Sequence, residues 1–80
     1  MSVCTVEFVI EPFVENAPGP HVMAGIEAME TRGLHVTMGP FGSIVSGTAS
    51  EVSGAIGAMV SAAVEDGAHR VLVEVVIDGP

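Results

Sequence analysis

Gly39-Pro40-Phe41-Gly42-Ser43-Ile44-Val45-Ser46-Gly47-Thr48-Ala49-Ser50-Glu51-Val52 is the stretch of this sequence that decides the fold. Gly39-Pro40 and Gly42 surround a single aromatic residue, which is typical of a tight bend. The β-prone residues 43–48 follow the bend and predict a strand. The middle of the chain therefore turns back on itself and separates two halves, each with the order strand, helix, strand.

The end of this stretch predicts the start of a helix. Thr48 and Glu51 have the spacing of a capping box, in which the hydroxyl and the carboxylate each accept a hydrogen bond from a free backbone amide. A helix is expected from about Ala49 to Glu65. The interior glycines Gly54 and Gly57 each cost about 1 kcal/mol relative to alanine and suggest close approach of a neighbouring helix or backbone. The predicted apolar stripe comprises Val52, Ile56, Met59, Val60, Ala63 and Val64.

The residues before the bend predict a strand, a helix and a second strand. Alternating apolar residues indicate a strand over residues 3–10, which Pro12 ends. A helical period begins near His21 and stops at Gly33. Residues 34–38 alternate again and are the expected antiparallel partner of the strand after the bend. The residues predicted to face the core are Val6, Phe8 and Ile10 in the strand and Val22, Met23, Ile26 and Met29 in the helix.

The last predicted strand, residues 71–77, is apolar on both sides. Val71, Val73, Val75 and Ile77 would form one face, and Leu72 and Val76 make the other face largely apolar as well. A strand of this kind is expected to be buried on both sides. Because both helices are needed on one face of the sheet, we expect a partner subunit to cover the other.

The element order predicts an α+β ferredoxin-like βαββαβ sandwich that occupies residues 1–80 as one domain. Right-handed crossovers place the first and third strands in the centre of the sheet. The expected architecture is a four-stranded antiparallel sheet of order 4-1-3-2 with two helices on one face.

Composition narrows the classes of function. Ten carboxylates against two arginines give a net charge of -8, which argues against binding to nucleic acid or to anionic membranes. Hydrophobic residues make up 49% of the chain, more apolar surface than a small monomer readily hides, so self-association is expected. Neither a membrane span nor a leader segment is evident, and we expect a soluble cytoplasmic protein. The single cysteine, Cys4, is expected to be a small buried hydrophobe.

Several segments carry a family resemblance. They are Val6-Glu7-Phe8 before Pro12, Gly33-Leu34, the stretch from Gly39 to Gly47, and His69-Arg70-Val71 leading to Ile77-Asp78. Together they resemble the YkoF-like thiamine-binding family over about residues 6–78. The family pattern after the bend reads Gly-Pro-x-x-Thr-x-Val-Glu-Gly, so Ser43 occupies its hydroxyl position and Ser46 its acidic position. The resemblance implies a dimer or tetramer that binds thiamine or its hydroxymethylpyrimidine moiety without catalysis.

The residues themselves suggest an acidic site on the sheet. If the first and last strands are antiparallel neighbours, Glu7 and Glu74 lie nearly opposite one another, and Glu11 and Asp78 share their face. Like charges in this arrangement attract a cation, which would be a metal, an arginine of a partner or the positively charged thiamine. The alternative is that the carboxylates are simply solvated in a loosely paired register.

Hydroxyls and one aromatic ring lie near the bend. Thr37, Ser43 and Ser46 supply hydrogen-bonding groups, and Phe41 offers a flat surface on which a pyrimidine would stack. The same residues are also ordinary components of a hairpin. With the resemblance, the expected ligand-binding residues are Glu7, Thr37, Phe41, Ser43 and Ser46.

No catalytic or metal-binding pattern is present. His21, His35 and His69 do not have the spacing of a metal site, and no nucleophile elbow or glycine-rich phosphate loop occurs. The first hypothesis is therefore a non-catalytic binding protein for thiamine or hydroxymethylpyrimidine that needs no cofactor. The alternative is a ligand-free structural or regulatory oligomerisation module. A small ferredoxin-like isomerase or monooxygenase is the third hypothesis. It is disfavoured because this sequence shows no His-Asp or Tyr-Arg constellation.

Overall fold

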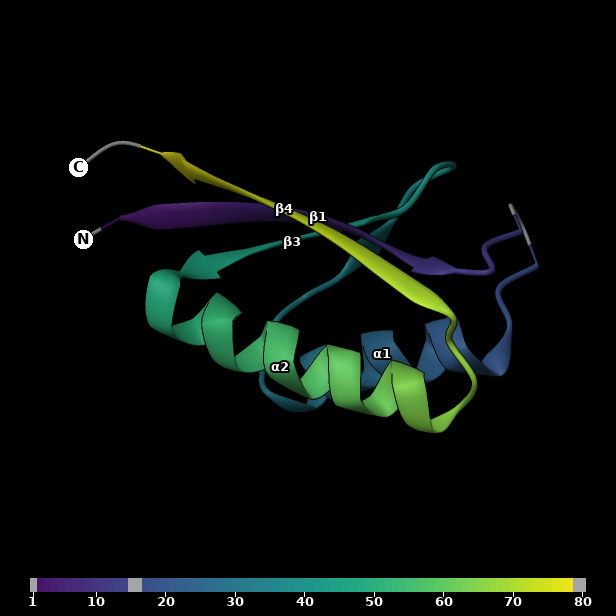
Figure 1. Ribbon diagram of the computed structural model, residues 1–80. Coiled ribbons are helices and arrows are strands. Elements are labelled where there is room, and N and C mark those ends of the chain that lie inside the picture. The colour runs from purple at the N-terminus through teal and green to yellow at the C-terminus, as the bar shows by residue number, and fades with distance from the viewer. Residues whose placement is uncertain (1, 15–16, 79–80) are drawn as a thin grey trace.

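The elements follow one another in the order that the sequence predicts (Figure 1). The computed structural model describes residues 2–14 and 17–78. Two segments of similar order, β-α-β, are joined by the bend at residues 39–42. The elements are β1 (Val3–Glu11), α1 (Pro20–Thr31), β2 (Thr37–Met38), β3 (Ser43–Thr48), α2 (Ala49–Glu65) and β4 (Arg70–Asp78).

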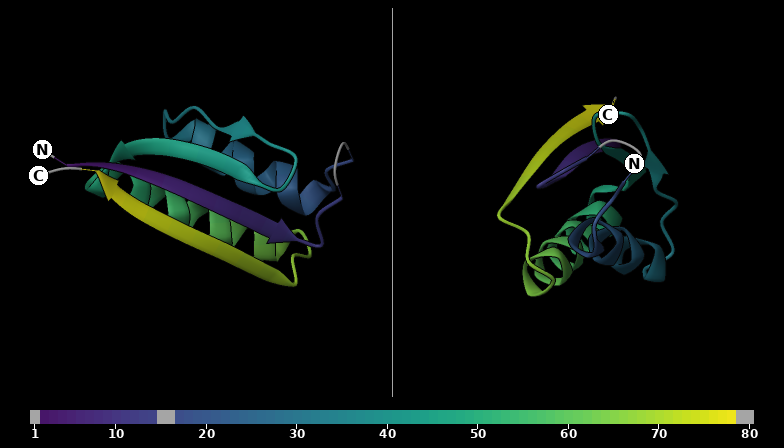
Figure 2. Two further views of the ribbon diagram at one scale, coloured as in Figure 1. Left: turned by 90° about the horizontal axis from the view of Figure 1, so that it is seen from above. Right: turned by 90° about the vertical axis from the view of Figure 1, so that its right-hand side faces the viewer.

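The strands form one antiparallel sheet with the order β2-β3-β1-β4. This is the predicted order 4-1-3-2, read from the opposite edge. Both helices lie on one side of the sheet, as the views along and across the strands show (Figures 1 and 2). The ferredoxin-like sandwich is therefore confirmed. We call the side of the sheet away from the helices the open face.

The helix signals in the sequence are confirmed in their details. The Glu51 backbone N–H donates to Thr48 Oγ1 at 3.2 Å, and the Thr48 N–H donates to Glu51 Oε1 at 2.9 Å, which completes the capping box. At the end of α1, Gly33 has a φ of +90°, a conformation that glycine adopts without strain. The strand before the bend is shorter than predicted, since Leu34 and Val36 pack against the core instead of extending β2.

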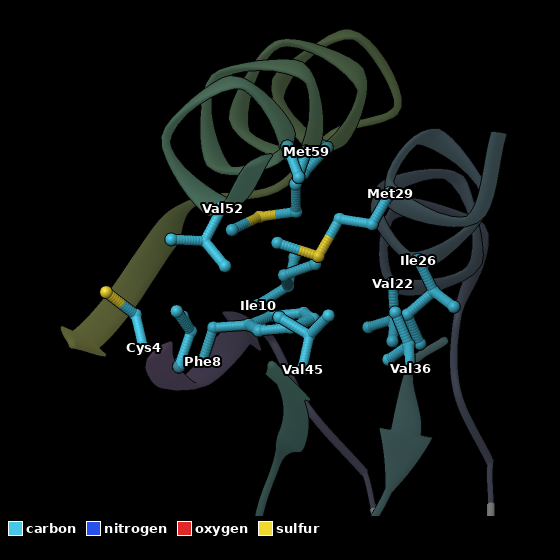
Figure 3. Packing of buried hydrophobic residues seen from close by; sticks show 13 residues of the cluster. Cys4, Phe8, Ile10, Val22, Ile26, Met29, Val36, Val45, Val52 and Met59 are labelled. Carbon is cyan, nitrogen blue, oxygen red and sulfur yellow. The ribbon is translucent and has the colours of Figure 1, made fainter. Parts of the chain in front are cut away.

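The core fills the space between the helices and the inner side of the sheet (Figure 3). Alternation along β1 places every second side chain in this layer. Two predicted core residues are wrong: Met23 and Val64 are 46% and 60% exposed. Each lies one residue, about 100° of helix rotation, beyond a buried neighbour. The buried hydrophobic residues are Cys4, Val6, Phe8, Ile10, Val22, Ile26, Met29, Val36, Val45, Val52, Ala55, Met59 and Ala63.

The close approach between helices occurs at Gly25 of α1. A Cβ at this position would lie 2.5 Å from Ile10 Cδ1 and 3.2 Å from Met59 Cγ, so a larger residue would collide with the core. The prediction that Gly54 and Gly57 of α2 permit close approach of a helix or backbone is wrong, because no other backbone lies near either glycine. Gly54 lies against the side chain of Arg32, whereas Gly57 faces open space.

Candidate functional site

The last strand is far more exposed than its apolar sequence predicts. In this chain β4 lies at the edge of the sheet, and the helices pack over β1 and β3. On the side facing the helices, Val73 and Ile77 are 38% and 67% exposed, and on the open face Leu72 and Val76 are 43% and 48% exposed. The expectation that the helices bury one side of β4 is therefore wrong for most of its length, whereas the open face was expected to be exposed in a single chain. Cover by a second subunit stays a prediction.

The register between β1 and β4 brings two carboxylates together. Glu7 pairs directly with Glu74, so both side chains project from the open face. The other two acidic residues of the predicted cluster have partners of their own. Glu11 Oε1 lies 3.4 Å from Arg70 Nε, and Asp78 Oδ2 accepts a hydrogen bond from Thr5 Oγ1 at 3.1 Å. The predicted cluster is thus reduced to one pair of like charges at its centre.

The bend at residues 39–42 rises on the side of the sheet away from the helices (Figure 1). The Gly39 backbone N–H donates to the Gly42 carbonyl at 2.6 Å and closes the turn. At Gly42 the bend approaches β1 so closely that a Cβ would lie 2.8 Å from the carbonyl oxygen of Phe8. This contact holds the bend beside the strand, while the ring of Phe41 is 84% exposed.

The bend and the open face together form a groove of about 480 Å³. The groove extends from Phe41 in the bend across Glu7 of β1 to Leu72 and Glu74 of β4. Its surfaces thus combine an aromatic ring, apolar side chains and two neighbouring carboxylates. This combination suits a flat, positively charged organic molecule, which would stack on the ring and donate hydrogen bonds to the carboxylates.

The structure brings together some of the predicted site residues. Glu7, Phe41 and Ser43 line the groove, but Ser43 is only 4% exposed, and its register with Phe8 directs its side chain toward the helices. Thr37 and Ser46 share the open face with Glu7, as their pairing with Ile44 and Thr5 indicates, yet they do not line the groove.

The sequence analysis placed Glu74 opposite Glu7, but the expected ligand-binding residues included neither Glu74 nor Leu72, both of which line the groove. The signal for Glu74 was present, since an antiparallel register between β1 and β4 places it opposite Glu7. Leu72 carries no such signal, because an apolar residue in a strand is more often part of a core. Only the position of the bend over the sheet shows that Leu72 borders a groove.

Within residues 2–14 and 17–78, no group of three or more histidine, cysteine, aspartate or glutamate side chains is placed to hold a metal ion. Cys4 is buried in the core, as predicted. Across the same residues, no helix has the length and apolar character needed to cross a membrane.

The fold and the groove define a class of protein, a small α+β ferredoxin-like domain with a partly acidic groove on its open sheet face. The sequence profile of the thiamine-binding protein family matches residues 6–79. This match covers nearly the whole chain, so the chain belongs to that family. The resemblance seen in the sequence is thereby confirmed.

Solved structures of similar fold come from several organisms. A hypothetical protein of Methanocaldococcus jannascii is 25% identical with a TM-score of 0.71, and the match covers 100% of this chain and 82% of that one. A Thermotoga maritima protein, described provisionally as one of thiamine biosynthesis or salvage, is 23% identical with a TM-score of 0.67, over 98% of this chain and 84% of that one. No match is found among curated proteins.

Proposed function

We propose that this protein binds thiamine or its hydroxymethylpyrimidine moiety reversibly in the groove and catalyses no reaction. The observation that carries the proposal is the Glu7 and Glu74 pair, which lies in one groove with the exposed ring of Phe41. Membership of the thiamine-binding family supports the choice of ligand. The provisional description of the Thermotoga maritima protein agrees with it.

The chemistry of thiamine complements the groove. Its thiazolium ring is positively charged, and its aminopyrimidine ring is flat, can be protonated and carries an exocyclic amine. The two carboxylates would offset the positive charge and accept hydrogen bonds from the amine. Phe41 would stack against one of the rings. The net charge of -8 further favours the approach of a cation.

Hydroxyl groups near the groove would orient the ligand. Thr37 and Ser46 are proposed as hydrogen-bonding partners because they share the open face with Glu7. Ser43 is a weaker candidate, since its side chain is buried toward the helices. We place this function in the cytoplasm, where the free thiol of Cys4 stays reduced.

Calorimetric titration with thiamine and with hydroxymethylpyrimidine tests the proposal. We expect saturable heat with one site per chain. Glu7→Gln and Glu74→Gln should each weaken binding about tenfold, since each removes a charged hydrogen-bond acceptor. The matched control is Glu27→Gln, an exposed glutamate on α1 that does not line the groove. No heat with either compound at millimolar concentration would refute the proposal.

A second candidate function is an oligomerisation module without a ligand. The exposed apolar residues of β4 favour it, because a large apolar surface on a small domain usually marks an interface. This candidate predicts that the protein self-associates in solution and gives no heat with either compound. Light scattering alongside the titration separates the two functions.

A further inference from the structure

We infer that the groove selects the unphosphorylated alcohol form of its ligand and rejects the phosphate esters, and that Glu74 together with Glu7 sets this preference. The identity of the ligand rests on the proposed function, whereas the preference follows from the charges in and around the groove. Thiamine and hydroxymethylpyrimidine both carry a primary alcohol. A phosphate ester of that alcohol brings about 1.5–2 negative charges at pH 7 and makes the whole molecule an anion or nearly neutral.

The charged groups in the groove are all negative. Among the described residues that line it, Glu7 and Glu74 carry charge, and none is a lysine, an arginine or a histidine. The two carboxylates are direct partners across β1 and β4, so a phosphate beside one is also close to the other. Two like charges about 5 Å apart in water weaken binding about fourfold. With two carboxylates and a doubly charged phosphate, the effects multiply to more than about tenfold.

The cations of the chain are engaged elsewhere. The sequence has no lysine and two arginines. The guanidinium of Arg32 lies against Gly54 of α2. Arg70 already contacts Glu11 at 3.4 Å. Its position on β4 is about 13 Å from that of Glu74, at about 3.3 Å per residue, and this exceeds the screening length of about 8 Å at physiological ionic strength. Neither arginine therefore offsets a phosphate that lies beside the glutamate pair.

The helix amides that commonly bind phosphate also lie away from the groove. Both helices are on the opposite side of the sheet (Figure 2). The first residue of α1 is Pro20, which has no backbone N–H. The start of α2 follows Thr48, at the end of β3 farther from the bend, and the Glu51 carboxylate already occupies it by accepting from the Thr48 N–H. The groove thus offers a phosphate two negative charges and no helix N-terminus.

Calorimetric titration with two matched pairs of compounds tests the preference. The pairs are thiamine with thiamine monophosphate, and hydroxymethylpyrimidine with its phosphate, in buffer without magnesium. We expect each ester to bind at least about tenfold more weakly than its alcohol, and this ratio to fall in 1 M NaCl because salt screens exposed charges. Esters that bind as tightly as the alcohols would overturn the preference and leave the proposed function intact. Absence of heat with all four compounds would refute both.

Variants locate the preference at Glu74. Glu74→Lys places a cation beside Glu7 and should lower the ratio of the two dissociation constants at least about tenfold, and the milder Glu74→Gln about fourfold. The matched control is Glu27→Lys on α1, which makes the same change of charge outside the groove and should leave the ratio within about twofold. Circular dichroism confirms that the variants are folded. An unchanged ratio in both Glu74 variants would overturn the role of this residue.

A double variant tests the nearest cation. Arg70→Gln/Glu11→Gln removes the ion pair on the open face and keeps the net charge, so the ratio should change less than about twofold. If the double variant weakens binding of the esters about tenfold and leaves binding of the alcohols unchanged, the phosphate reaches Arg70. The groove would then accept the phosphorylated forms through that arginine, and the inferred preference would be wrong.

Discussion

β1 and β4 are neighbours of equal length and similar apolar content, yet they differ in how much of that content is buried. Both strands have nine residues, and they pair along their whole length. On the side facing the helices, Val6 of β1 is fully buried, whereas its partner Val75 on β4 is 43% exposed. The position of a strand in the sheet, and not its apolar character, therefore decides how far each valine is buried.

The comparison separates two uses of hydrophobic residues. In β1 they hold the helices to the sheet, and their removal leaves a cavity in the core. In β4 they lie beside the groove and along an open edge. We therefore expect changes in β1 to act on stability and changes in β4 to act on binding and association.

The largest effect should come from the buried phenylalanine of β1. Phe8→Ala should lower the free energy of unfolding by about 3–5 kcal/mol, because Phe8 is only 2% exposed and its loss leaves a cavity. Phe41→Ala is the matched control, since the same side chain is 84% exposed in the bend and its removal should change stability by less than about 0.5 kcal/mol. Urea denaturation measures both. Equal losses would contradict the distinction between core and groove.

Phe41→Ala should nevertheless have a functional effect. If the ring stacks on the ligand, its loss should weaken thiamine binding about tenfold, which is within the range for an aromatic ring that stacks on a base. Calorimetry on the folded variant measures this. Unchanged affinity would exclude Phe41 from the proposed site.

The next prediction compares Val6 and Val75, which lie side by side on the neighbouring strands β1 and β4. Val6→Ala should lower the free energy of unfolding by about 2 kcal/mol, from two buried methyl groups and the cavity that they leave. Val75→Ala should lower it by about 0.5 kcal/mol or less at low protein concentration. Equal losses for the two variants would mean that β4 is covered in solution. A loss for Val75→Ala that grows with protein concentration would identify the cover as a second copy.

Much of the fold was predictable because its signals are local. Thr48 and Glu51 specify the start of α2, Gly33 follows the end of α1, and the alternation of Val6, Phe8 and Ile10 specifies the inner side of β1. Each signal acts within a few residues, so a single sequence displays it fully. Met23 was misplaced because one residue separates the buried stripe from the exposed side of a helix.

The candidate site was less predictable because it depends on contacts between distant segments. The register of β1 and β4 pairs Glu7 with Glu74 across most of the chain, and the close approach of Gly42 to Phe8 sets the bend beside the strand. Ser43 shows the limit of the residue pattern. Its hydroxyl fits the family position, but the strand register turns the side chain toward the core.

The smallest effect should have the opposite sign. Glu74→Gln removes one of two like charges that face each other, so it should raise the free energy of unfolding by about 0.3 kcal/mol at low salt. The gain should shrink in 1 M NaCl, because salt screens exposed charges. Glu27→Gln on α1 is the control, since its carboxylate does not belong to this pair.

The Glu74→Gln variant therefore tests two properties at once, the free energy of unfolding and the affinity for thiamine. A variant that is slightly more stable and binds thiamine less tightly would show that the chain keeps a repulsive pair for its ligand, as binding sites often do. Thermal unfolding at low and high salt measures the first property, and calorimetry measures the second. A variant that loses stability would mean that Glu74 has a favourable contact in solution, and the pair would then be structural and not a binding feature.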